Sequence, residues 1–136
     1  MDASGILSAL DAGDPQHDAS LQVLRRPGPR LLSPLVLAEV DYLTATRSGR
    51  RAQMAFLDDV AEGVYHLEAF SQDDVIEAIE ILRRYDDLDL GLADASLVVI
   101  ARRHGVHDLL TLDERHFRAV PGPGDRPFRL LPTDRD

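Results

Sequence analysis

The sequence contains no cysteine, no lysine and no asparagine. Without cysteine the chain has no disulfide framework, no thiol nucleophile and no thiolate metal site. Without lysine it cannot act as a P-loop nucleotidase, a receiver domain or a haloacid-type phosphatase, because each of these needs a lysine near the phosphate or the reacting aspartate. A G-x-S-x-G turn is also missing, so serine hydrolase chemistry is not expected.

Low-complexity tracts and long apolar runs are absent as well. Hydrophobic residues make up 44% of the 136 positions and charged residues 29%. This composition is typical of a folded chain that does not enter a membrane, and we expect a single domain over residues 1–136. No basic leader precedes the short apolar stretch at the N-terminus, so we expect the protein to be cytoplasmic.

Positive charge is scarce relative to negative charge. The chain has 15 arginines against 24 acidic residues, which gives a formal net charge of −9. This charge argues against a protein that coats nucleic acid through bulk positive charge. The excess acids either solvate the surface or converge on a cation, and the charge count leaves both possibilities open.

Proline, glycine and helix-capping residues divide the chain into alternating helices and strands. The predicted helices cover residues 4–13, 14–26, 34–49, 50–63, 71–85 and 90–105. The predicted strands cover residues 30–33, 64–70, 108–112 and 126–132. Strands and helices that alternate in this way form parallel sheets with crossover helices, so the pattern predicts an α/β fold.

Acidic residues recur where such a fold places ligands. Asp113 follows the strand 108–112 directly, and Asp2 stands just before the first helix, where a first strand would end. Asp94 lies in the first turns of the helix 90–105, and Glu39 lies in the helix that follows the strand 30–33. Ligands of α/β proteins bind beyond the carboxyl ends of the strands, so we expect these acids to converge.

Converging carboxylates repel one another unless a cation neutralises them. Carboxylate oxygen is the ligand that Mg²⁺ and Mn²⁺ prefer, whereas zinc is a poor candidate in a chain without cysteine. Each acid also has an ordinary explanation: Asp113 as a helix cap, Asp94 at a helix dipole, Asp2 as a solvated terminal acid, and Glu39 paired with Arg47 or Arg51. Capping does not explain why acids recur after separate strands.

Four segments then point to a known family. The segments are DAS at residues 2–4, LSPLVLAEVDYL at 32–43, LGLADASLVVIARRHGV at 90–106 and LLTLDERHF at 109–117. Together and in this order they resemble PIN-domain ribonucleases, specifically the VapC toxins of bacterial type II toxin–antitoxin systems. The resemblance spans the whole chain. It implies a three-layer α/β/α fold with a central, mainly parallel sheet of four to five strands.

The resemblance also implies a reaction and the residues that carry it. It implies an endoribonuclease toxin that depends on Mg²⁺ or Mn²⁺ and hydrolyses structured RNA, either tRNA or rRNA. It further implies a VapB-type antitoxin as partner and a homodimer. The catalytic and metal-binding acids would be Asp2, Glu39, Asp94 and Asp113, supported by the hydroxyls of Ser4 and Thr111.

An RNA substrate has to approach an acidic protein, so local arginines should bind its phosphates. The candidates are Arg47, Arg50 and Arg51 in one group and Arg115 and Arg118 in another. The guanidinium fork matches phosphate geometry, although such clusters are often only solvated surface. Tyr42, one turn from Glu39, has the right chemistry to stack on a base, but we favour a core position for it.

The sequence departs from the family at its N-terminus. Members usually carry several apolar strand residues before the first aspartate, whereas only Met1 precedes Asp2 here. We therefore expect either a shortened central strand or a natural start upstream, and we favour a truncated or misassigned start. The rival functions are a non-catalytic PIN-like module that binds RNA or protein, and a PIN nuclease in RNA processing outside a toxin–antitoxin pair.

Overall fold

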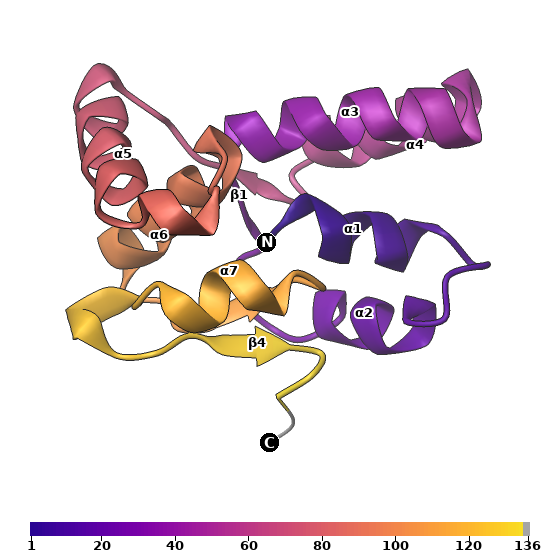
Figure 1. The fold of residues 1–136 in the computed structure, drawn as a ribbon. Helices are drawn as coiled ribbons and strands as arrows, with labels where there is room; N and C mark the ends of the chain where they lie inside the picture. The colour runs from indigo at the N-terminus through magenta and orange to yellow at the C-terminus, as the bar shows by residue number, and fades with distance from the viewer. Residues whose placement is uncertain (135–136) are drawn as a thin grey trace.

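The computed structural model describes residues 1–134, and it shows helices packed around short parallel strands (Figure 1). The helices are α1 (Ala3–Leu10), α2 (His17–Leu24), α3 (Pro34–Ser48), α4 (Arg50–Ala61), α5 (Gln72–Arg84), α6 (Leu92–His104) and α7 (Glu114–Ala119). Short 3-10 turns lie at η1 (Asp86–Leu88) and η2 (Pro123–Asp125). The strands are β1 (Leu31–Leu32), β2 (His66–Leu67), β3 (Asp108–Leu110) and β4 (Arg129–Leu131). The predicted α/β class is confirmed.

The strands form two parallel pairs instead of one continuous sheet. Strand β1 pairs with β2, and β3 pairs with β4. The first two residues lie between the pairs, because the Met1 amine donates to the Leu31 carbonyl at 3.4 Å and the Asp2 amide donates to the Leu110 carbonyl at 2.8 Å. The expected sheet of four to five strands is therefore divided, since its central strand is too short to form a ladder. Burial lowers the pKa of the Met1 amine to about 6.

Local sequence signals set the start of several helices. Ser33 caps α3 by accepting a hydrogen bond from the Leu35 amide, and Pro34 occupies the first turn. Ser71 and Asp74 form a reciprocal capping box at the start of α5. Helix α6 ends at Gly105 in the left-handed conformation that glycine tolerates best.

Other boundaries differ from the sequence-based prediction. Helix α1 begins at Ala3, before the predicted start at residue 4, because the Asp2 side chain caps it by accepting a hydrogen bond from the Ala3 amide. Helix α2 begins at His17 and not at residue 14, since the Asp14 carboxylate accepts a hydrogen bond from the Gln16 amide and holds a turn there. The strands expected at 30–33, 64–70, 108–112 and 126–132 are all shorter, because only two or three residues of each pair with the neighbouring strand.

The helices pack as pairs around the strands, and the apolar core lies between them. In Figure 1, α1 packs with α2 on one side, α5 with α6 on the other, and α3 with α4 above. Fully buried core side chains include Ile6 of α1, Val36 of α3 and Leu130 of β4. In the described part of the chain, no helix has the length and apolar character needed to span a membrane.

Gly5 lets α1 approach β3 closely. A Cβ atom at this position would lie 2.5 Å from Leu110 Cγ and 3.0 Å from the Leu110 carbonyl oxygen. We therefore expect Gly5→Ala to lower the free energy of unfolding by about 1–3 kcal/mol, measured by chemical denaturation. Gly13→Ala is the matched control, because its Cβ would meet only the exposed Asp11 carboxylate at 3.3 Å. Equal stability of the two variants would contradict the packing argument.

Candidate active site

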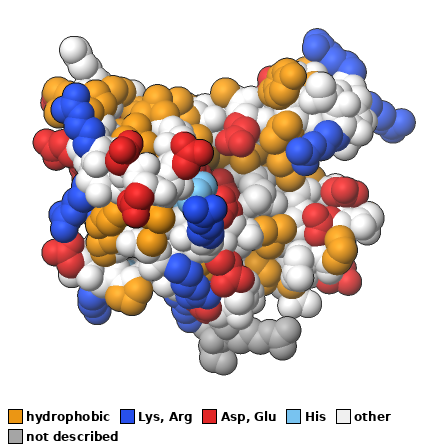
Figure 2. All heavy atoms as spheres, viewed as in Figure 1, with side chains coloured by type: hydrophobic (Ala, Val, Ile, Leu, Met, Phe, Trp, Pro, Cys, Tyr) orange, Lys and Arg blue, Asp and Glu red, His pale blue; other side chains and the backbone are white. Residues whose placement is uncertain are grey.

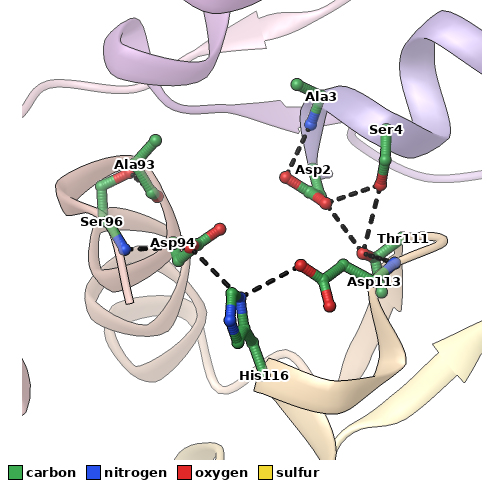
Figure 3. A network of polar contacts seen from close by, with 10 residues as sticks. Asp2, Ala3, Ser4, Ala93, Asp94, Ser96, Thr111, Asp113 and His116 are labelled. Atoms are coloured by element: carbon green, nitrogen blue, oxygen red, sulfur yellow. Dashed lines mark hydrogen bonds and ion pairs between the residues drawn. The ribbon is translucent and has the colours of Figure 1, made fainter. Parts of the chain in front are cut away.

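Asp2 is a buried carboxylate held by several donors. Asp2 is 6% exposed and lies directly before α1, at its N-terminus (Figure 3). Oδ1 accepts a hydrogen bond from the Ala3 amide at 2.8 Å. Oδ2 accepts from the Ser4 hydroxyl at 2.7 Å and from the Thr111 hydroxyl at 2.8 Å. Asp2 is therefore not the solvated terminal acid that the sequence left open.

The two hydroxyls link α1 to the loop after β3. The Ser4 hydroxyl also accepts a hydrogen bond from the Leu112 amide at 3.0 Å. The Thr111 hydroxyl likewise accepts from the Asp113 amide at 3.0 Å, and Thr111 is fully buried. Each hydroxyl thus donates to Asp2 and accepts from the backbone, so the loop that carries Asp113 is tied to Asp2.

Asp94 projects from the first turn of α6. Its Oδ2 accepts a hydrogen bond from the Gly91 amide at 3.1 Å, so the capping role proposed from sequence is present. Capping does not explain the raised pKa of Asp94, however. Burial raises the pKa of Asp94, and the neighbouring charges of Asp2 and Asp113 raise it further against the opposing effects of Gly91 and His116.

Asp113 and Glu39 are held more loosely. Asp113 stands before α7, but its side chain makes no capping hydrogen bond and is 42% exposed, so capping does not explain it. Glu39 lies exposed on α3, and within residues 1–134 it forms no ion pair with Arg47 or Arg51. Partial burial raises the pKa of Glu39, and the charges of Asp2 and Asp94 add to this effect.

The four acids are therefore electrostatic neighbours, although they come from four separate segments. Glu39 is affected by Asp2 and Asp94, and Asp94 by Asp2 and Asp113. In the described residues, no group of three or more His, Asp and Glu side chains is arranged so that it could hold a metal ion. The donors have the chemistry that Mg²⁺ and Mn²⁺ require, and the loosely held Asp113 and Glu39 are the ones that can turn.

Comparisons with known proteins identify the family of this chain. Residues 1–123 match the family model described as PIN domain. The chain is 38% identical to Ribonuclease VapC26 of Mycobacterium tuberculosis over 133 residues, which cover 97% of this chain and 98% of the relative. The chain belongs to the PIN-domain VapC family.

A solved VapC structure supports the same assignment. The crystal structure of VapC20 from Mycobacterium tuberculosis, described as a toxin that cleaves the sarcin-ricin loop, matches with a TM-score of 0.76 and 25% identity. The match covers 83% of this chain and 88% of VapC20. The family and the α/β fold that the motifs indicated are thus confirmed.

Sequence reasoning did not single out one residue that lies beside the candidate acids. His116 of α7 has its Nδ1 atom 3.0 Å from Asp113 Oδ2 and 3.5 Å from Asp94 Oδ2 (Figure 3). From the sequence, only its neighbours Arg115 and Arg118 were considered, as candidates for RNA binding. The position of His116 three residues after Asp113, in the first turn of a helix that follows the strand, was the available signal.

The candidate RNA-binding arginines fall into two groups in the structure. Arg47, Arg50 and Arg51 are exposed where α3 meets α4, and Arg47 lines a cavity of about 470 Å³ that also contains Ser4. Figure 2 shows arginine side chains gathered at that end of the molecule, above a hollow. Arg115 is also exposed. These four make no ion pairs with the other described residues.

Arg118 has a different environment from the other four. Its guanidinium bonds Asp134 at 2.5 and 2.7 Å and Glu114 at 3.1 Å. This pairing lowers the pKa of Asp134 to about 2. An RNA phosphate would have to compete with these two carboxylates for Arg118.

Tyr42 was predicted to lie in the core. That prediction is wrong, because Tyr42 is 67% exposed on α3.

Proposed function

We propose that this VapC protein is a metal-dependent endoribonuclease toxin, with Mg²⁺ or Mn²⁺ held by Asp2, Asp94 and Asp113 and by Glu39 directly or through water. One observation carries the proposal. Burial raises the pKa values of both Glu39 and Asp94, and the Asp2 charge raises both further. Acids that raise one another's pKa are stabilised by a cation, and carboxylates of this kind select hard divalent metals.

The four acids have different roles in the proposed site. A bound divalent cation would lower the pKa of a water and offset the negative charge that develops on the scissile phosphate. Asp2 is the fixed donor, because Ser4, Thr111 and the Ala3 amide hold both of its oxygens. Asp94 is fixed by the Gly91 amide, and Asp113 and Glu39 are free to adjust when substrate and cation arrive.

Structured RNA, tRNA or rRNA, is the proposed substrate. The VapC20 relative is described as a toxin that cleaves the sarcin-ricin loop, and its fold matches this chain. Arg47 lines the cavity that also borders Ser4, and Arg50 and Arg51 are exposed at the start of the next helix, so these three arginines are assigned to bind RNA phosphates. Arg115 is the nearest exposed arginine in sequence to Asp113 and is assigned the same role.

The partners follow from the family and from the charge of the site. A VapB-type antitoxin that presents a basic group would neutralise the acids and exclude RNA, and both proteins would act in the cytoplasm. A homodimer is also proposed, because Ile76 and Ile79 are exposed on α5, with 54% and 38% of their surface accessible. A dimer that covers these two side chains would remove apolar surface from water.

Removal of divalent metal tests the proposed function. Purified protein incubated with rRNA or tRNA should cleave it in Mg²⁺ or Mn²⁺ and leave 5′-phosphate ends. Excess EDTA should reduce cleavage to background, and added Mn²⁺ should restore it, because the acids need the cation to act. Cleavage that persists in EDTA would contradict the metal site. Tight RNA binding without cleavage in either metal would favour a non-catalytic module instead.

A further inference from the structure

The His116 side chain connects two of the proposed metal-binding acids. It is 19% exposed and projects from α7 toward the N-terminus of α6 (Figure 3). Its Nδ1 lies 3.0 Å from Asp113 Oδ2 and 3.5 Å from Asp94 Oδ2. A single ring nitrogen therefore faces carboxylates from two separate elements.

This nitrogen is shielded from water and has no satisfactory hydrogen bond. Within residues 1–134, His116 Nδ1 is one of the buried side-chain polar atoms without a well-oriented partner, although both carboxylates are close. A buried polar atom left in this state costs free energy, so its position needs an explanation. The adjacent Asp113 carboxylate is 42% exposed and has no capping bond, so it can turn to accept a hydrogen bond.

Asp113 differs from Asp2 and Asp94 in how its carboxylate is held. Asp2 is held by hydrogen bonds from Ala3, Ser4 and Thr111, and Asp94 is held by the Gly91 amide. Asp113 has no such fixed donor to its side chain among the described residues, and His116 Nδ1 is the nearest candidate. Carboxylates that bind a metal are themselves held by hydrogen bonds from neighbouring groups, and an imidazole N–H is a suitable donor.

We propose that His116 is a positioning residue of this site: its Nδ1–H donates to the Asp113 carboxylate and holds it beside Asp94. The donation leaves the second Asp113 oxygen available for the cation. His116 acts through Asp113 and is not itself a metal ligand in this assignment. The inference rests on the proposed metal-dependent function.

Substitution of His116 with measurement of Mn²⁺ binding tests this role. We expect His116→Ala to weaken Mn²⁺ binding about 10–100-fold in isothermal titration, the usual effect of losing a partner of a ligating carboxylate. The Mn²⁺ concentration that gives half-maximal cleavage should rise by a similar factor. His116→Asn can place an amide N–H near the position of Nδ1 and should restore most of the affinity, whereas His116→Gln places its N–H near Nε2 and should not.

His107→Ala is the matched control, because His107 contacts Arg126 at the far end of β3. Unchanged Mn²⁺ affinity in His116→Ala would overturn the proposal, and so would an equal loss in the Ala and Asn variants. A lower unfolding temperature with unchanged Mn²⁺ affinity would assign His116 to packing alone and would also overturn it. Wild-type protein that binds no Mn²⁺ would overturn the metal site itself, and this inference with it.

Discussion

Asp94→Asn should abolish metal-dependent cleavage and leave the protein at least as stable as the wild type. The loss of one acid from a divalent metal site should lower the rate by about 10³-fold or more, which corresponds to roughly 4 kcal/mol of transition-state stabilisation. Burial and the charges of Asp2 and Asp113 raise the pKa of Asp94, so its charged form is disfavoured in the folded state. Asparagine removes that charge and keeps an oxygen that can accept from the Gly91 amide.

The sign of the stability effect follows from proton linkage. A carboxyl whose pKa is higher in the folded state loses folding free energy as the pH rises past the ordinary aspartate range. At neutral pH without metal, Asp94→Asn should therefore raise the midpoint of thermal unfolding. Added Mn²⁺ should stabilise the wild type and have little effect on the variant.

Asp87→Asn provides the matched control for this experiment. Asp87 is exposed in η1, a few residues before α6, and the substitution is chemically identical. It should leave cleavage and Mn²⁺ binding unchanged. Equal activity of Asp94→Asn and wild type would remove Asp94 from the site.

Thr111→Val should lower both stability and activity. The Thr111 hydroxyl donates to Asp2 Oδ2 at 2.8 Å and accepts from the Asp113 amide at 3.0 Å. Valine has nearly the same shape but can neither donate nor accept a hydrogen bond. It therefore leaves the buried Asp2 oxygen and the partly buried Asp113 amide without this partner. We expect the free energy of unfolding to fall by about 1–3 kcal/mol, measured by urea denaturation.

Two further threonine variants separate the hydroxyl from the change in shape. Thr111→Ser keeps the hydroxyl and should retain most of the activity. Thr44→Val makes the same substitution at a threonine that is 5% exposed and whose hydroxyl has no hydrogen-bond partner in the described residues. It should leave stability unchanged or increase it, because no hydrogen bond is lost. Similar destabilisation by Thr44→Val and Thr111→Val would show that the hydrogen bonds to Asp2 and Asp113 are not the cause.

The sequence identified much of the site because its motifs are local and ordered. Asp94 could be placed in the first turn of α6, since the helix that contains it is marked by apolar residues and ends at Gly105. Asp113 could be placed after β3 because it follows an apolar strand directly. Neither placement shows how close the acids come, because the distances depend on contacts between segments far apart in the chain.

The N-terminus illustrates the same limit. The sequence left open a shortened central strand or a start upstream, and it did not show that Met1 and Asp2 would bridge two separate strand pairs. Nor did it show that Asp2 would be almost fully buried. That burial results from Ser4 on one side and Thr111 on the other, and these residues are separated by more than a hundred positions.

By itself the sequence determined the α/β class, most helix starts and the order of the four acids, because capping residues and apolar spacing act over a few positions. Only the tertiary structure decided that Asp2 is buried among hydroxyls, that His116 faces two acids and that Arg118 is paired with Asp134 and Glu114. Those contacts join distant segments. They form only when the helices pack around the strands and bring these side chains within a few ångströms of one another.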